Sequence, residues 1–138
     1  MTEPLPPNVL ALLDHTREIQ IETRVAQDVP PDRTTIWVVV DDDEQRALIR
    51  TFRGPSSRWY RRALDQGVVT IVAEGRKISV SLERAADAER IAACSAAIRA
   101  KYGDTTSVAG MLAEENLPTT LELRTPTPPA EGRRGEGS

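Results

Sequence analysis

Apolar and polar residues alternate along several short segments of the chain. A period of two is typical of a β-strand that buries one face, because successive side chains point to opposite sides of a sheet. Ile19 and Ile21 alternate with polar neighbours in one such segment, whereas residues 34–40 are β-branched almost throughout. The pattern predicts six strands, over residues 18–25, 34–40, 45–52, 68–75, 77–84 and 120–124.

Three other segments repeat apolar residues every three or four positions, which is the period of an amphipathic helix. Residues 8–17 form the first, with Asn8 as the expected N-cap, and residues 58–67 form the second and end at a glycine. The longest follows Asp87, another expected N-cap, and stops at Gly103. Its core-facing positions are predicted to be Ile91, Cys94, Ser95, Ile98 and Tyr102.

The predicted strands follow one another in hairpins and do not alternate with helices, which argues against a doubly wound parallel sheet. The pattern favours a mainly β protein: an antiparallel barrel, closed or nearly closed, with the long helix packed on it. The 138 residues fit one domain. We expect residues 1–7 to be a flexible N-terminus, residues 8–125 to form the barrel domain, and residues 126–138 to be a disordered tail.

Charge changes this picture at one place. The chain has a formal net charge of −3, yet residues 46–62 contain six arginines and no aspartate or glutamate. This segment therefore carries +6, and the rest of the chain must sum to −9. An arginine cluster is either a solvated face or a binding site for an anion, and here it lies on one predicted strand and the loop that follows it.

The loop "FRGPSS" has the composition of a phosphate site. Phosphate is bound by guanidinium groups, hydroxyls and backbone N–H groups that converge on one point, and a helix start supplies further donors. A glycine in the loop permits close approach of the backbone. The candidate ligands in and beside the loop are Arg50, Thr51, Arg53, Gly54, Ser56, Ser57, Arg58 and Trp59. Arg33, Thr34 and Thr35 are further candidates, because they open the strand that is expected to pair with residues 45–52. Trp59 would either stack on a ligand or pack on the barrel, and the two threonines have an equally ordinary role as strand residues.

The sequence offers neither a catalytic triad nor a metal site. His15 and Cys94 are the only residues of their kinds, both fall in predicted helices, and neither has a plausible partner. The acidic run at residues 41–44 is typical of a hairpin turn. No apolar run approaches the roughly 18 residues that a membrane span needs, and the N-terminus lacks the features of a signal peptide. We therefore expect a cytoplasmic protein without a membrane span.

The order of "RTTIWVVV", "IRTFRGPSSRWYRRAL" and "VVTIVAEGRKISV" resembles the flavin- and deazaflavin-binding split-barrel superfamily. Within it the chain is similar to deazaflavin-dependent nitroreductases and to pyridoxamine-phosphate-oxidase-like proteins. It most resembles a branch of that superfamily classed as a domain of unknown function, which "AIRAKYG" also resembles. The resemblance covers about residues 17–124.

This resemblance implies a six-stranded antiparallel split β-barrel, often dimeric, that holds FMN or a deazaflavin by its phosphate. Carried over by position, Arg33, Thr34 and Thr35 would lie near the ring or ribityl part of the cofactor. Residues 51–58 would hold the phosphate, through Thr51, Arg53, Gly54, Ser56 and Arg58. If the protein is an enzyme, the resemblance implies a flavin- or deazaflavin-dependent reductase or oxidase, in which the cofactor carries the chemistry.

Several alternatives stay open. The chain has "QDVPPD" where deazaflavin enzymes carry a glycine-rich lead-in with Lys-Ser-Gly, so FMN, deazaflavin and no cofactor are all compatible with it. A non-enzymatic barrel that binds a phosphorylated small molecule, or no ligand, is a second reading. Binding of single-stranded nucleic acid ranks last, because that function needs aromatic stacking platforms and the acidic chain has only five aromatic residues.

The tail gives a direct test of the domain boundaries. Residues 126–138 contain no apolar side chain larger than that of Ala130, so their removal should leave stability unchanged. Thermal unfolding of the full chain and of a chain ending at Thr125 checks this. A melting temperature lowered by several degrees in the shorter chain would show that the tail packs on the domain.

Overall fold

The computed structural model describes residues 2–24, 26 and 28–126, and within them the strands form a single sheet. All of its pairings are antiparallel. The strands lie in the order β3-β2-β6-β7-β8-β5-β4, with β1 paired to β8. Their bounds are β1 Glu3–Pro4, β2 Glu18–Thr23, β3 Asp32–Trp37, β4 Val39–Asp41, β5 Arg46–Ile49, β6 Val68–Ala73, β7 Arg76–Arg84 and β8 Leu121–Thr125.

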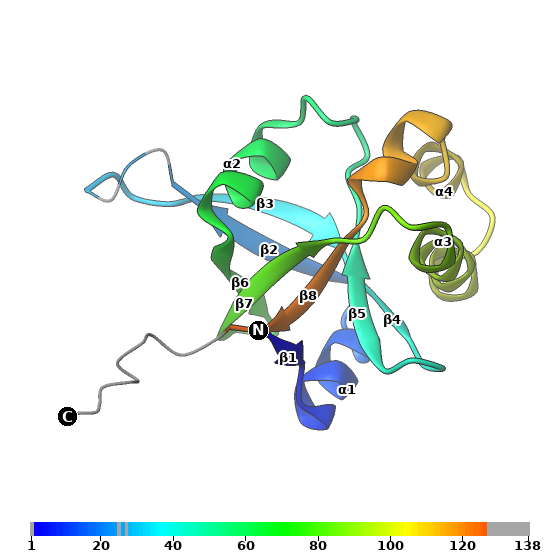
Figure 1. Cartoon of the computed structure of the whole chain (residues 1–138), viewed down its shortest axis with the longest axis horizontal. Helices are drawn as coiled ribbons and strands as arrows, with labels where there is room; N and C mark the ends of the chain where they lie inside the picture. The colour runs from blue at the N-terminus through cyan, green and yellow to red at the C-terminus, as the bar shows by residue number, and fades with distance from the viewer. Residues whose placement is uncertain (1, 25, 27, 127–138) are drawn as a thin grey trace.

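The two outermost strands of this order, β3 and β4, are consecutive in the chain, and only Val38 separates them. One bent segment thus supplies both edges, so the sheet must curl until its ends approach each other (Figure 1). The predicted split-barrel class is confirmed. The predicted number of six strands is wrong for the described residues, which have eight. The bend divides the predicted strand 34–40 in two, and β1 adds a short pairing.

The described residues also form α1 (Pro7–His15), α2 (Arg58–Gln66), α3 (Ala88–Tyr102), α4 (Thr106–Met111) and a 3₁₀ helix, η1 (Glu114–Thr119). The first three confirm the predicted helices, whereas α4 and η1 were not predicted. Asp87 caps α3 as expected, its carboxylate accepting from the backbone N–H of Arg90 at 3.0 Å. The predicted cap of α1 is wrong: the N-cap is Pro6, not Asn8, because a proline at the first helical position starts the helix earlier.

The apolar side chains form two clusters. The larger fills the barrel and is covered by α1 and α2, and its fully buried members include Leu13, Ile21 and Ile71. The smaller lies between α3, α4 and the β4–β5 hairpin. On the predicted core face of α3, Cys94, Ile98 and Tyr102 are buried, while Ile91 and Ser95 are half-buried. None of the described helices has the length and apolar character needed to cross a membrane.

The N-terminal segment differs from the expectation of a flexible end. Glu3 pairs with Thr125 and Pro4 with Arg124, and the next residue, Leu5, is buried in the larger cluster. A short strand and one apolar anchor therefore fix this segment to the barrel. The predicted disordered tail is a different case, since its residues 127–138 lie outside the described part of the chain.

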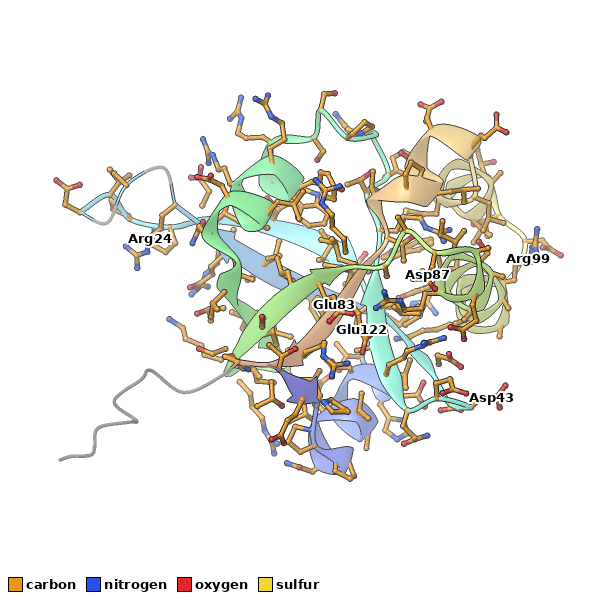
Figure 2. All side chains as sticks on the ribbon, in the orientation of Figure 1. Arg24, Asp43, Glu83, Asp87, Arg99 and Glu122 are labelled. Carbon is orange, nitrogen blue, oxygen red and sulfur yellow. The ribbon has the colours of Figure 1, made fainter. Side chains whose placement is uncertain are left out.

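An ion-pair network joins α3 to the outer face of the barrel. Arg90 of α3 contacts Asp87 at 2.6 Å, Glu83 of β7 at 2.6 Å and Glu122 of β8 at 2.9 Å. Figure 2 shows the three carboxylates gathered beside the start of α3. Glu122 is buried, and a buried carboxylate is tolerated only where cations and hydrogen bonds compensate it. Arg124 supplies a second cation, 2.7 Å from Glu122.

The bend between β3 and β4 is held by hydrogen bonds from two side chains of α3. Val38 belongs to neither strand, and its carbonyl accepts from Lys101 Nζ at 2.7 Å and from the Tyr102 hydroxyl at 3.2 Å. Lys101 Nζ also donates to the carbonyls of Leu13 and Thr16 at the end of α1. Burial lowers the pKa of Lys101 to about 8, so at neutral pH the ammonium still provides all three protons. The last turn of α3 thus holds both the bend and the end of α1.

We expect Lys101→Met to lower the free energy of unfolding by about 2 kcal/mol, because three carbonyls lose a charged donor. Urea unfolding at pH 7 measures this. Lys77 is the matched control, since it is the other lysine of the chain and its side chain is 63% exposed. Lys77→Met should change stability by less than about 0.5 kcal/mol. Equal effects of the two substitutions would show that the bend does not depend on Lys101.

Candidate functional site

The loop between β5 and α2 brings the arginine-rich segment to the start of a helix. Gly54 has a φ of +83°, a conformation that glycine adopts without strain, and its carbonyl accepts from the Ser57 N–H at 3.1 Å. Ser57 is the N-cap of α2, but its side chain makes no capping hydrogen bond. The Ser57 hydroxyl and the first N–H groups of α2 are therefore available to a ligand.

A cavity of about 780 Å³ lies beside this loop. Its walls come from β3, the loop, α2 and α4, and from Thr23 at the end of β2. All six residues of β3 line it, from Asp32 to Trp37. Because consecutive side chains of a strand point to opposite faces, a cavity that meets all six must follow the edge of the strand. Among the described strands β3 pairs only with β2, so this edge is open to the cavity.

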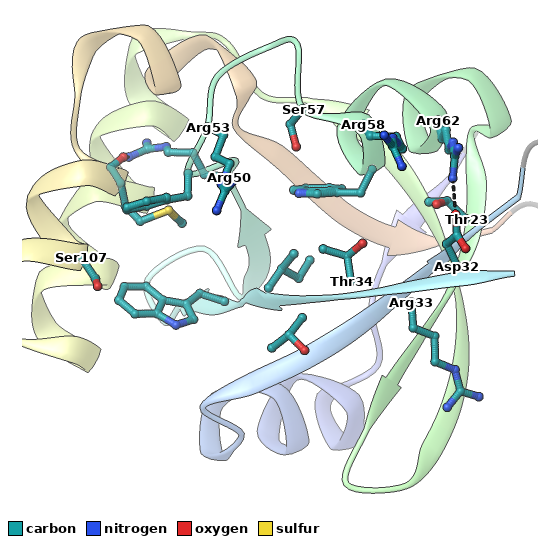
Figure 3. Close-up of a pocket in the computed structure, with 16 residues that line it drawn as sticks. Thr23, Asp32, Arg33, Thr34, Arg50, Arg53, Ser57, Arg58, Arg62 and Ser107 are labelled. Carbon is teal, nitrogen blue, oxygen red and sulfur yellow. Dashed lines mark hydrogen bonds and ion pairs between the residues drawn. The ribbon is translucent and has the colours of Figure 1, made fainter.

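Two arginines at the cavity have no ion-pair or hydrogen-bond partner among the residues that the structure describes. Arg53 comes from the loop and Arg58 from the first turn of α2, and both are exposed. Figure 3 shows them on either side of Ser57, all three pointing toward β3. Arg62, one turn further along α2, is instead paired with Asp32 at 2.5 Å. The exposed positive charge that faces the cavity without compensation thus lies in the loop and at the start of α2.

Eight of the eleven predicted site residues line the cavity: Arg33, Thr34, Thr35, Arg50, Arg53, Ser57, Arg58 and Trp59. Thr51, Gly54 and Ser56 do not. Thr51 is fully buried, and its hydroxyl bonds with Thr119 at 3.0 Å and Asn116 at 3.3 Å, so its expected contact with phosphate does not fit its position. The sequence suggested a loop position for Thr51, but it gave no sign that the side chain points toward η1.

Arg33 lines the cavity because it lies on the edge strand, but its guanidinium is directed elsewhere. Its Nε donates to the buried carboxylate of Glu22 at 2.8 Å, and Figure 3 shows the side chain pointing away from Arg58 on the other side of β3. Thr34 has the opposite orientation and points toward α2. Because successive side chains of β3 alternate between its two faces, Arg33 and Thr34 point in opposite directions although they are neighbours in the sequence.

Arg50 also differs from its expected role. Only 1% of its surface is exposed, and its guanidinium extends toward α3 and α4. Nε donates to the Thr120 hydroxyl, Nη1 to the Ser95 hydroxyl and the Met111 carbonyl, and Nη2 to the Ile91 carbonyl, at 2.9–3.2 Å. Burial lowers its pKa. The guanidinium of Arg50 is therefore directed toward α3 and α4, although the residue lines the same cavity as Arg53 and Arg58.

Half of the sixteen lining residues were not predicted: Thr23, Asp32, Ile36, Trp37, Phe52, Arg62, Ser107 and Met111. Asp32, Ile36 and Trp37 adjoin predicted positions on the same strand, so an edge-lined cavity would have included them. Ser107 and Met111 belong to α4, a helix of six residues whose apolar pattern is too short to signal it. Nothing in the sequence connected α4 to the loop.

The lining contains neither histidine nor cysteine. His15 is exposed on α1, and Cys94 is fully buried on the core side of α3. Within the described residues no group of acidic, histidine or cysteine side chains could hold a metal ion. Among the described residues, the lining of the cavity thus combines two unpaired guanidinium groups with serine and threonine side chains and one aspartate.

Comparison with known proteins places the chain in a family. The sequence profile of the family described as "uncharacterized protein conserved in bacteria" (DUF2255) matches residues 9–123. The chain belongs to the DUF2255 family. No curated protein is significantly similar to this DUF2255 member in sequence.

Solved structures share the fold. The heme storage protein HutZ from Vibrio cholerae superposes with a TM-score of 0.62 at 14% identity, covering 91% of this chain and 92% of HutZ. A NimC/NimA family protein from Clostridium acetobutylicum gives 0.60 at 10%, covering 86% and 79% of the two chains. A candidate pyridoxamine 5′-phosphate oxidase from Listeria innocua gives 0.54 at 10%, covering 85% and 88%. At these identities the likeness establishes the split-barrel fold of the DUF2255 chain.

We expect Cys94 to be inert in the folded protein. Burial raises its pKa to about 11, so iodoacetamide at pH 8 should alkylate it at least about 100-fold more slowly in the native state than in urea. Between the unfolded pKa of about 8.5 and the folded value, the folded state holds the extra proton, so the contribution of Cys94 to stability falls as pH rises. Mass spectrometry of timed samples measures the reaction, and equal rates in both states would contradict this burial.

Proposed function

We propose that this protein binds a flavin or deazaflavin cofactor, with the cofactor phosphate at Arg53, Ser57 and Arg58, and acts as a reductase or oxidase through it. The observation that carries the proposal is the pair of uncompensated guanidinium groups beside a free hydroxyl at the start of α2, all facing one cavity. Guanidinium forks match the geometry of phosphate oxygens, and the start of a helix favours negative charge.

The rest of the cavity suits such a group. Its volume of about 780 Å³ falls within the roughly 300–1,000 Å³ that is usual for cofactor sites. Beyond the phosphate end, the side chains of Ile36 and Trp59 give apolar and aromatic lining of the kind that a planar ring system needs. The residues present therefore fit a phosphorylated cofactor with an aromatic ring.

When bound, a flavin or deazaflavin supplies hydride or electron transfer, and the protein supplies position and electrostatics. The described residues of the lining are consistent with this division of roles between cofactor and protein. Asp32 is the acidic residue of the lining, and its carboxylate is paired with Arg62. The chain's own contribution is thus to hold the phosphate, to order the ring against β3 and to keep the site positively charged.

The printed names of two structural neighbours bear on the class of ligand. One is a candidate oxidase of pyridoxamine 5′-phosphate, which is a phosphorylated compound. Another is a heme storage protein, but the cavity here has no histidine or cysteine to bind iron. A phosphate-bearing ligand therefore fits the lining better than heme does.

A non-enzymatic barrel that binds a phosphorylated small molecule is the second candidate. It rests on the same two guanidinium groups and hydroxyl, which would hold the phosphate of any such molecule. Purification distinguishes the two functions: bound flavin colours the protein yellow, and mass spectrometry of the released molecule identifies any other phosphorylated ligand.

We expect Arg58→Ala to weaken FMN binding by about 10- to 150-fold, because a charge-assisted hydrogen bond contributes roughly 1.5–3 kcal/mol. Arg53→Ala should act in the same direction. The loss should shrink for riboflavin, which has no phosphate. Isothermal titration of FMN, the corresponding deazaflavin and riboflavin measures these affinities.

Arg61→Ala is the matched control, since Arg61 lies on the same helix, is exposed and does not line the cavity. It should leave FMN affinity within about 3-fold of the wild type. The proposal fails if the wild type binds neither FMN nor the deazaflavin. It also fails if Arg58→Ala weakens riboflavin as much as FMN.

A further inference from the structure

We infer that the end of the cavity formed by Arg50, Trp37 and Phe52 is a second ligand site, which takes a planar aromatic carboxylate. As an assignment of substrate class this rests on the proposed cofactor function, because the site adjoins the proposed cofactor site in one cavity. The binding itself is a property of the chain and can be measured without any cofactor.

The charge of Arg50 is the first support. All four of its hydrogen-bond acceptors are neutral, being two hydroxyls and two backbone carbonyls. Within the described residues no carboxylate pairs with it, and the second N–H of Nη2 has no acceptor. Buried arginines are normally paired, since an uncompensated charge in the interior is costly. An anionic group that enters from the cavity would supply both the missing acceptor and the missing charge.

The aromatic surfaces are the second support. One face of the Trp37 ring is stacked on Tyr102, with centroids 3.9 Å apart and planes 13° apart, so the cavity can meet only the opposite face or an edge. The Phe52 ring lies against the backbone of Gly110, where a Cβ would come within 2.3 Å of it, and the residue is still 51% exposed. Packing thus fixes two aromatic surfaces that a planar ligand could cover.

The position of this end is the third support. Figure 3 places Ser107 of α4 at one end of the cavity and Arg58 and Arg62 of α2 at the other. Arg50 reaches toward the α4 end, since it donates to the Met111 carbonyl. Phosphate at α2 and a carboxylate at Arg50 would therefore occupy separate parts of one cavity, with aromatic surface near the second. Carboxylate suits Arg50 because a single guanidinium matches its two oxygens.

Titration of the full chain with benzoate and benzamide, followed by tryptophan fluorescence and calorimetry, tests the inference. The two probes have the same shape, but only benzoate is charged. We expect benzoate to bind, and benzamide to bind at least about 10-fold more weakly. Arg50→Met should weaken benzoate by about 10- to 100-fold and Phe52→Ala by about 3- to 10-fold. Arg58→Ala should leave benzoate affinity within about 3-fold of the wild type.

The inference of a carboxylate site would be overturned if the wild-type protein binds no benzoate, or if it binds benzoate and benzamide equally. It would also be overturned if Arg58→Ala removes benzoate binding, since benzoate would then occupy the phosphate site. Should Arg50→Met not fold, the comparison of the two probes and the variant of the half-exposed Phe52 still decide the matter. FMN binding without benzoate binding refutes this inference alone, whereas benzoate binding without any flavin binding refutes the proposed cofactor and leaves the carboxylate site.

Discussion

The barrel depends on one carbonyl group, that of Val38. This residue lies where a single segment leaves one edge of the sheet and joins the other, so its backbone belongs to neither ladder. An unpaired buried carbonyl would favour a different path for the chain. Lys101 and Tyr102, at the end of a helix more than sixty positions later, donate to it and fix the bend. The bend that closes the sheet and the docked end of α3 therefore share the same hydrogen bonds.

The bend also creates the cavity. Because β3 ends at Trp37, just before the bend, and β4 pairs with β5, the far edge of β3 is left without a partner strand among the described residues. The loop 50–57 and α2 cover that edge only with side chains, so a space remains between them. A straight strand that paired on both sides would have filled it. The cavity is thus a consequence of how the barrel closes, and its lining residues come from the elements that border it.

The sequence was informative where the signal is local. Period-two alternation located the six strand segments, and the caps located α3, because both are set by neighbouring residues. It was uninformative where side-chain direction depends on distant partners. Arg33 turns to Glu22, Thr51 to Thr119, and Arg50 to residues 41–70 positions away, and no local pattern encodes these contacts. The six-residue α4 was missed because it spans fewer than two helical turns.

Ion pairing explains why an acidic protein can keep a positive site. Of the six arginines in residues 46–62, Arg46 is paired with Asp41 and Glu89, and Arg62 with Asp32. These carboxylates come from outside the segment, so part of the surplus acidity of the chain neutralises those arginines that have structural roles. Arg61 is exposed but does not line the cavity, and Arg50 is buried with neutral hydrogen-bond acceptors. Arg53 and Arg58 are thus the exposed, uncompensated charges of the cavity. Ion pairing thus lowers the uncompensated charge of this segment below its formal +6. The exposed charge that remains at the cavity would attract an anion there.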